Sequence, residues 1–363
     1  MASGLTVPMN HAAERERPHF SNRFTRRFGQ AHPFAGAGMG FAGMAPELAI
    51  AVSRAGGIGA LGVGLMPPDE LRSKIRAIRA ACEAPFNINF LTCFDNDAQI
   101  RVCVEERVPI VSFHWGHPSD EHLSLLQNAG VSVWEQVGTV EAGKLAAAGG
   151  IEVVIAQGWE AGGHNYGGLG TMALVPAMVD AIGERAMVLA AGGIMDGRGA
   201  AAALMLGADG VWVGTRLVAS EEAHVHPFHH QAMLKASGSD TVRSSIFGPE
   251  MPAFNPMRLL RNRVVNEYTD RLAEVPMERS HLPVIGETVV HGMPHVKRKF
   301  DVMLPVPQTT GDFEEMPWLA GQGVGLVREI FPAGTIVTRM MSEAAKIIRH
   351  QAESLIDRTG ATS

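Results

Sequence analysis

Cysteine is scarce in this chain. The 363 residues include only Cys82, Cys93 and Cys103, an odd number at spacings that match no zinc ribbon. This pattern excludes a disulfide framework and does not indicate a zinc site. We expect each cysteine to be a small buried hydrophobe in a reducing compartment, of which the cytoplasm is the simplest.

Long apolar runs are missing as well. No stretch of about 18 uninterrupted apolar residues occurs, so the sequence predicts no membrane-spanning helix. The first twenty residues contain His11, Glu14, Arg15, Glu16 and Arg17 where a secretory signal peptide needs an apolar core. The sequence therefore predicts a cytoplasmic protein that makes no use of a membrane.

An excess of basic charge is also absent. The chain has 31 Lys and Arg against 37 Asp and Glu, a formal net charge of −6, which argues against a nucleic-acid partner. Its residues are 46% hydrophobic and 19% charged, as in a compact globular protein, which excludes a disordered or collagen-like chain. Glycine, by contrast, is abundant at 41 residues, which indicates tight turns and backbone brought close to another group.

Short apolar segments alternate with stretches of helical spacing along the first 220 residues. Most of these segments are continuous rather than alternating, as expected of parallel strands that are covered on both faces. The repeat predicts a (β/α)8 TIM barrel, with a doubly wound open sheet as the alternative, because a strand count cannot show closure. Strands are expected at 33–35, 57–61, 86–90, 109–113, 131–134, 152–156, 187–191 and 210–214, and helices at 46–55, 69–81, 139–148 and 197–206.

Four regions are expected along the chain. Residues 1–20 are interpreted as a flexible N-terminal arm and residues 21–220 as the barrel. Residues 221–300 lose the strand–helix rhythm, and we interpret them as an inserted helical cap that serves the substrate. Residues 301–363 contain a glycine-rich turn at 320–323 and a helical tail, which we expect to pack back on the barrel.

Glycines stand at the two strand ends where TIM barrels often hold a phosphate. The seventh strand leads into Gly192 and Gly193, and the eighth into Gly214 and Thr215. Glycine lets backbone N–H groups approach an oxyanion, the helix that opens after Asp196 would add its dipole, and the threonine hydroxyl would add a hydrogen bond. Two ordinary tight turns are the alternative, but both motifs at the expected strand ends favour a phosphate site.

A second glycine-rich loop, residues 157–167, follows the sixth strand and carries His164. Its glycines would allow a planar ligand to lie against the backbone. A histidine of near-neutral pKa can take a proton from a weakly acidic carbon. A lone loop histidine is more often a structural hydrogen-bonder, but the position of His164 beside the expected phosphate favours a catalytic base.

Other polar groups are weaker candidates. Ser112, His114, Trp115 and His117 follow the fourth strand, and we expect them to line the same pocket, with loop packing as the alternative. Four histidines lie between positions 224 and 230, but no carboxylate or cysteine partner stands at a fixed spacing, so no metal site is predicted. The basic run 258–263 is interpreted as a solvated helix face, with attraction for an anionic substrate as the alternative.

Together these stretches resemble the nitronate monooxygenases, formerly called 2-nitropropane dioxygenases. Residues 157–164, 190–199 and 214–216 carry the resemblance, which extends from about Phe20 to the turn at 320–322. It implies a TIM barrel that holds FMN non-covalently and oxidises alkyl nitronates or nitroalkanes with O2, to carbonyl compounds and nitrite. The chain departs from the family pattern at Gly38-Met39-Gly40, where many members have Pro-Met-Ala, and again after His164.

The resemblance also implies residue roles. His164 matches the family's active-site histidine. The implied partners are a small nitronate or nitroalkane and molecular oxygen, and the formation of a homo-oligomer is left open. The implied FMN site comprises Gly192, Gly193, Gly214 and Thr215 at the phosphate, Met39, Asn89 and Gln136 near the isoalloxazine ring, and Ala161, Gly162 and Gly163 along the flavin.

Two alternatives stay open at this point. The same superfamily includes NAD(P)H-dependent FMN reductases of quinones or enoyl thioesters, which have similar glycine motifs and a similarly placed histidine. Fold similarity does not decide between these activities. A non-catalytic FMN- or nucleotide-binding sensor is the third interpretation, and it would require His164 to be idle.

Overall fold

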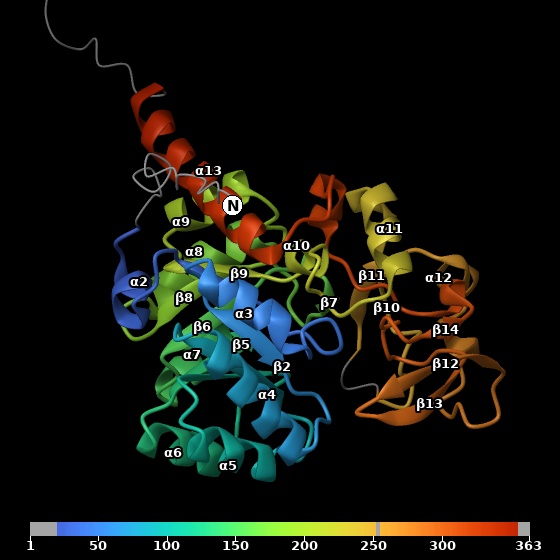
Figure 1. The fold of residues 1–363 in the computed structure, drawn as a ribbon. Helices are drawn as coiled ribbons and strands as arrows, with labels where there is room; N and C mark the ends of the chain where they lie inside the picture. Colours follow the sequence, from blue (N-terminus) through green and yellow to red (C-terminus); the bar gives the residue numbers. More distant parts are fainter. Residues whose placement is uncertain (1–19, 252–254, 355–363) are drawn as a thin grey trace, which may run out of the picture.

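Eight parallel strands form the core of the computed structural model, which describes residues 20–251 and 255–354. Their order is β1-β9-β8-β6-β5-β4-β3-β2. The two ends of this sheet meet, because Ile58 donates to the carbonyl of Phe34 at 2.9 Å and Gly36 donates to that of Ile58 at 2.8 Å. The sheet is therefore a TIM barrel, as the sequence predicts, and not an open doubly wound sheet (Figure 1). Apart from Phe20, the expected N-terminal arm lies outside the described residues.

The expected strands and helices are all present within a few residues of their predicted bounds. The barrel strands are β1 (Phe34–Gly36), β2 (Gly59–Gly62), β3 (Phe86–Leu91), β4 (Ile110–His114), β5 (Ser132–Val137), β6 (Val153–Gln157), β8 (Met187–Ala191) and β9 (Gly210–Val213). The helices are α2 (Arg23–Phe28), α3 (Pro46–Arg54), α4 (Pro68–Ala81), α5 (Asp97–Glu105), α6 (Asp120–Asn128), α7 (Val140–Ala148), α8 (Thr171–Ile182), α9 (Gly197–Met205), α10 (Thr215–Val218) and α13 (Ala333–Ser354).

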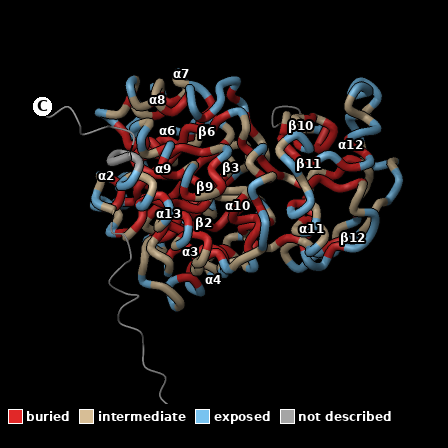
Figure 2. The backbone as a smooth tube through the Cα atoms, turned by 90° about the horizontal axis from the view of Figure 1, so that it is seen from above, coloured by how far each residue is buried: buried red, intermediate tan, exposed pale blue. Residues whose placement is uncertain are grey.

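Burial on both faces explains why the strands are continuously apolar. Outward side chains pack under the helices, while inward ones such as Ile110, Trp134 and Leu189 fill the barrel. Phe24 of α2 packs against Trp134, with ring centroids 5.8 Å apart, and joins the same interior cluster. Figure 2 shows the resulting concentration of buried backbone along the strands.

The C-terminal helix α13 packs against α3 and α9 of the barrel. Its Glu343 carboxylate accepts a hydrogen bond from the backbone N–H of Gly197 at 2.8 Å. The described part of the helical tail therefore lies on the barrel. Residues 310–311, by contrast, form β14 (Thr310–Gly311) and pair with the segment that follows the barrel.

That segment contains as much strand as helix, which differs from the helical character predicted for it. Two antiparallel sheets occur there, β10-β11-β7 and β13-β12-β14. The difference arises because a turn with positive φ at His291 and Gly292 folds two strands into a hairpin, and polar residues interrupt the apolar ones in both strands, so that no continuous apolar run reveals them. The additional elements are α11 (Pro227–Lys235), α12 (Arg263–Tyr268), β7 (Gly163–His164), β10 (Thr241–Ser244), β11 (Met257–Leu260), β12 (Val284–Val290) and β13 (Met293–Arg298), with short 3-10 turns at Gly238–Asp240, Leu272–Glu274, Phe313–Glu315 and Gln322–Leu326.

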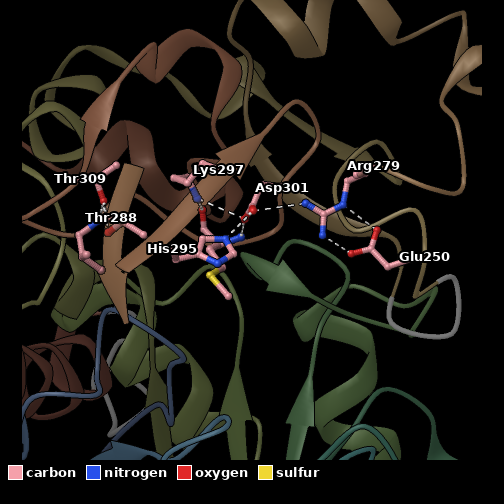
Figure 3. Close-up of polar contacts among 9 residues, drawn as sticks. Glu250, Arg279, Thr288, His295, Lys297, Asp301 and Thr309 are labelled. Atoms are coloured by element: carbon pink, nitrogen blue, oxygen red, sulfur yellow. Dashed lines mark hydrogen bonds and ion pairs between the residues drawn. The ribbon is translucent and has the colours of Figure 1, made fainter. Parts of the chain in front are cut away.

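A buried polar cluster ties β13 to the chain that follows it (Figure 3). Lys297 is 0% exposed, and its Nζ lies 3.2 Å from Asp301 Oδ1 and 2.6 Å from the Met303 carbonyl. The other carboxylate oxygen of Asp301 accepts from His295 Nε2 at 2.9 Å and lies 3.3 Å from an Arg279 nitrogen. The buried lysine is thus compensated by a carboxylate whose own contacts are satisfied.

No helix in residues 20–251 and 255–354 combines the length and the hydrophobicity that crossing a bilayer requires.

Candidate active site

Polar side chains occupy the barrel interior near the carboxyl ends of the strands. Asn87 and Asn89 of β3 both donate to the Ser112 hydroxyl of β4, at 2.7 and 2.8 Å. Gln136 lies two residues after the interior Trp134, so strand alternation directs it to the same face. The carbonyl oxygen of the Asn87 side chain is buried and has no hydrogen-bond partner among the described residues. Such an orphaned acceptor suits a ligand that offers an N–H group.

Gln157 is the last residue of β6 and links the barrel to the loop that carries His164, the predicted base. Its Nε2 donates to the backbone carbonyl of His164 at 2.9 Å, while its Oε1 is buried without a partner in the described chain. Sequence reasoning missed this side chain as a site residue. The signal was present, because Gln157 stands two residues after the interior Ile155 at the end of its strand.

The loop after β1 lies over β3 and β9. The sulfur of Met39 is 3.9 Å from the position that a Cβ on Gly214 would take. A Cβ on Gly38 would fall 2.1 Å from the Asn89 side chain, so the amide occupies the space that any side chain at position 38 needs. This close approach accounts for glycine at position 38, whereas a Cβ on Gly40 would meet nothing within 4 Å. The structure brings Met39, Asn89 and Gly214 together, as expected of three residues that share one ligand.

The two predicted phosphate motifs also meet. Gly192 and Gly193 have φ values of 109° and 72°, a left-handed backbone that glycine adopts without strain. The Thr215 hydroxyl accepts a hydrogen bond from the backbone N–H of Gly321 at 3.0 Å. A Cβ on Gly323 would lie 3.2 Å from the Gly193 carbonyl. The turn at 320–323 therefore holds the ends of β8 and β9 next to each other.

The first turn of α9 does not contribute to this site in the way the sequence suggested. The backbone N–H of Gly197 is bound to Glu343, and those of Arg198 and Gly199 are bound to the Asp196 carboxylate at 3.0 and 3.3 Å. Two carboxylates therefore occupy these three amides, so they are not free to bind a phosphate, and the expected contribution of the helix dipole stays a prediction. Only the strand-end backbone and Thr215 are left for that task.

The glycines of the loop after β6 are needed for two different reasons. A Cβ on Gly162 would meet the Gly321 nitrogen at 2.5 Å, so the chain itself makes the close approach there. Gly163 has a φ of 73°, and a Cβ added to it would meet only the Leu319 side chain, at 3.7 Å. The preceding Ala161 is 7% exposed. The space beside Gly163 is therefore the more open of the two.

His164 lies at the barrel mouth with its ring against Trp115. The two ring centroids are 4.2 Å apart in an edge-to-face arrangement. Burial, with a further contribution from His114, lowers the pKa of His164 to about 3. Burial likewise lowers the pKa of His114 to about 4. Both imidazoles are therefore neutral near pH 7, but the near-neutral pKa expected of His164 as a base is not found in the protein alone, because burial disfavours the protonated ring.

The loop after β4 reaches this site only in part. Trp115 adopts a left-handed φ of 74°, and Thr92 holds it by donating to the Trp115 carbonyl at 2.6 Å. His114 packs near Tyr166, with ring centroids 5.9 Å apart. His117 turns outward instead, with Nδ1 2.6 Å from Glu135 Oε2. His114 and Trp115 thus lie beside the loop of His164 and His117 does not, and a pocket shared by the first two stays a prediction.

The four neighbouring histidines have separate contacts. His226 caps α11 by accepting from Phe228 at 3.1 Å, and its ring stacks on Phe313 at 4.2 Å. His229 is fully buried, and His230 Nε2 bonds to the Val218 carbonyl at 2.8 Å. Within the described chain, no three His, Cys, Asp or Glu side chains are arranged to hold a metal ion.

Known proteins are similar to this chain in sequence and in fold. The family model described as "Nitronate monooxygenase" matches residues 22–98 and 91–343. A nitronate monooxygenase of Paraburkholderia phytofirmans is 30% identical over 351 residues, which cover 84% of this chain and 90% of that protein.

Two solved structures are also similar. FabK from Thermotoga maritima has a TM-score of 0.77 and 33% identity, covering 92% of this chain and 99% of its own. Nitroalkane oxidase from Streptomyces ansochromogenes has a TM-score of 0.73 and 27% identity, covering 89% and 98%. With a family model across most of its length, the chain belongs to the nitronate monooxygenase family and is a flavin-dependent oxidoreductase.

Proposed function

We propose that this enzyme binds FMN at the C-terminal mouth of the barrel and oxidises alkyl nitronates and nitroalkanes with O2, to carbonyl compounds and nitrite. The observation that carries the proposal is the position of His164 at that mouth, where its ring contacts Trp115. Its lowered pKa leaves a ring nitrogen free to accept a proton, and the bound substrate anion would have to raise that pKa for the imidazole to act as an effective base. The relative from Paraburkholderia and the nitroalkane oxidase structure support the substrate class.

The residues at the mouth fit a flavin mononucleotide. Asn87 and Gln157 offer buried side-chain oxygens that lack partners in the described chain, as an isoalloxazine N–H requires. The left-handed backbone at Gly192 and Gly193, together with the Thr215 hydroxyl, would hold the phosphate. When bound, the flavin supplies the acceptor for the substrate's electrons.

The chain's own side chains would supply the remaining chemistry. His164 would take the α-proton of a nitroalkane on a ring nitrogen, or hold the anion of a nitronate that is already formed. Trp115 would exclude water from that nitrogen, and the low polarity around the ring would keep the imidazole neutral until the substrate arrives. Gln157 would fix the His164 backbone through its 2.9 Å hydrogen bond.

A second candidate is an NAD(P)H-dependent reductase of quinones or enoyl thioesters. The match to FabK, at a TM-score of 0.77, is the observation that favours it. The two candidates differ in the donor of electrons: the first takes them from the nitronate and the second from NAD(P)H.

An anaerobic absorbance spectrum tests both candidates. The purified, FMN-loaded protein is mixed with an alkyl nitronate, and a fresh sample is mixed with NADH or NADPH. We expect the nitronate to change the oxidised-flavin bands and the nicotinamides to leave them unchanged. Bleaching by NADH or NADPH alone would transfer the assignment to the reductase, and a protein that cannot be loaded with FMN would contradict both.

Replacing Gly193 by valine is expected to strip the protein of FMN. A β-branched residue at a φ of 72° costs about 1–3 kcal/mol, and its Cβ would lie 3.1 Å from Glu160 at the proposed phosphate. The measurement is the flavin-to-protein absorbance ratio after gel filtration. Gly168→Val is the matched control, because a Cβ there meets nothing within 4 Å. A Gly193→Val protein that keeps full FMN would refute this placement of the phosphate.

A further inference from the structure

Four rings form a continuous row at the barrel mouth. The ring centroid of Trp115 lies 4.2 Å from that of His164 and 5.7 Å from that of His114. The His114 centroid lies in turn 5.9 Å from that of Tyr166, so the row connects the loop after β4 with the loop after β6. Tyr166 stands at its outer end and is 43% exposed, whereas His114 is buried. The predicted base is therefore linked by ring contacts to a tyrosine side chain that reaches the solvent.

Both neighbours of Tyr166 in the chain are held in place. Asn165 is buried, and its side chain donates to two backbone carbonyls of its own loop, at 3.1 and 3.0 Å. The backbone carbonyl of Asn165 accepts from Arg243 at 2.8 Å. A Cβ on Gly167 would lie 2.4 Å from the Gly138 carbonyl, so these two backbones are in contact. The backbone that carries Tyr166 is therefore fixed on both sides.

The basic run 258–263 contributes to this anchoring. Arg258 lies in β11 and is 3% exposed, so the expectation of a solvated helix face is wrong for this residue. Its guanidinium group donates to the Trp159 carbonyl at 3.1 and 3.3 Å, in the same loop as Tyr166. Because β11 also pairs with β7, the loop after β6 is tied to the segment that follows the barrel as well as to the barrel itself.

The hydroxyl of Tyr166 has no hydrogen-bond partner among the described residues. Burial, with a further contribution from Cys93 just after β3, raises the pKa of this hydroxyl. The phenol therefore remains protonated at neutral pH and can donate a hydrogen bond. The imidazoles of His114 and His164 are neutral as well. An anion held against this row would depend on neutral donors, and the Tyr166 hydroxyl is a donor that the described protein leaves unused.

We propose that Tyr166 is a specificity-determining residue whose hydroxyl donates a hydrogen bond to an oxygen of the nitro or nitronate group held at His164. This inference rests on the proposed function. When His164 takes the α-proton of a nitroalkane, the electron pair of the broken C–H bond forms a C=N bond, and the negative charge moves to the two nitro oxygens. A donor at those oxygens binds the nitronate more tightly than the neutral nitroalkane and stabilises the transition state between them. Tyr166 lies in the stretch after His164 where this chain departs from the family pattern.

Nitrate, a planar anion with the N–O geometry of a nitronate, tests the donor without turnover. FMN-loaded wild type and Tyr166→Phe are titrated with nitrate, and the change in flavin absorbance gives each dissociation constant. Phenylalanine keeps a ring in the row and removes only the hydroxyl. Tyr166→Phe should therefore bind nitrate about tenfold or more weakly, the usual effect of losing a hydrogen bond to a charged group. If the wild type does not bind nitrate, or if both proteins bind it equally, the proposal fails.

Steady-state kinetics separate the two effects of the hydroxyl. With a nitronate that is already formed, Tyr166→Phe should raise KM about tenfold and change kcat little, because the donor acts on the bound ground state. With a neutral nitroalkane, kcat should fall about tenfold instead, because the charge develops only in the transition state. Tyr268→Phe is the control, since it removes the same hydroxyl from a ring that packs on Phe300, 5.0 Å away between centroids, and it should change neither value.

The FMN content of each protein is measured alongside. Loss of FMN from Tyr166→Phe would assign the hydroxyl to the flavin and overturn the proposal. A wild type that does not turn over nitronates would contradict the proposed function. Normal nitronate turnover that Tyr166→Phe leaves unchanged would contradict only the role of Tyr166.

Discussion

His164→Ala is expected to lower kcat/KM for neutral nitroalkanes by about 10²- to 10⁴-fold, the usual contribution of a positioned general base. The same variant should keep its FMN, because the ring of His164 contacts Trp115 and the proposed phosphate contacts come from other residues. Turnover of a nitronate that is already formed should fall less, since that substrate needs no proton removal. Steady-state kinetics with each nitroalkane and its nitronate measure the ratio.

A control variant and a pH profile distinguish loss of the catalytic base from a general disturbance of the structure. His117→Ala removes a histidine of the same region that faces outward to Glu135, and it should leave both activities unchanged. Since burial lowers the pKa of His164 to about 3, the imidazole stays neutral as the pH falls through 6.5. Nitroalkane turnover should therefore show no decline between pH 7 and pH 5 that depends on His164. If His164→Ala keeps its activity on nitroalkanes and on nitronates equally, His164 has no role in the mechanism.

Asp301→Asn is expected to lower the free energy of unfolding by about 3–5 kcal/mol, the usual cost of breaking a buried ion pair from one side. The substitution would leave the ammonium group of Lys297 buried without its carboxylate, as Figure 3 makes clear. Urea unfolding at pH 7 measures the loss. Activity of the folded variant should persist at low temperature, because the cluster lies in the cap sheet β13-β12-β14 and not at the barrel mouth.

The pH dependence of this loss has a definite sign. Burial alone would raise the pKa of Asp301, but Lys297, His295 and Arg279 outweigh it and hold that pKa below its usual value. The stabilisation is therefore present above the unfolded pKa of about 3.9 and is lost as the pH falls through the lower folded value. The difference between wild type and variant should therefore be smaller at pH 3 than at pH 5.

Two further variants decide whether the uncompensated charge of Lys297 causes the loss of stability in Asp301→Asn. Adding Lys297→Met to Asp301→Asn should recover part of the stability, because the buried charge is then gone. Asp312→Asn breaks an ion pair with Arg263 in which both side chains are about half exposed, and it should cost at most about 1 kcal/mol. An Asp301→Asn protein as stable as Asp312→Asn would show that the buried cluster contributes little.

Local sequence pattern was sufficient for the barrel and for assigning the candidate site residues to the carboxyl ends of its strands. Continuous apolar segments, glycine stops and helical spacing are properties of neighbouring residues, and each barrel unit buries its own strand under its own helix. The glycines at the ends of β8 and β9 and the histidine after β6 follow from that repeat, because the carboxyl ends of parallel strands meet at one edge.

Only the tertiary structure decided which distant segments complete the site. The pairing of Gly163 with Arg258, the contact of Gly38 with Asn89 and the hydrogen bond from Gly321 to Thr215 join residues far apart in the chain. Such contacts depend on three-dimensional packing and leave no periodic signal in either partner. The strands that follow the barrel could not be recognised from the sequence, because polar residues such as Arg258 and Glu287 interrupt their apolar ones, whereas the barrel strands are continuous apolar runs.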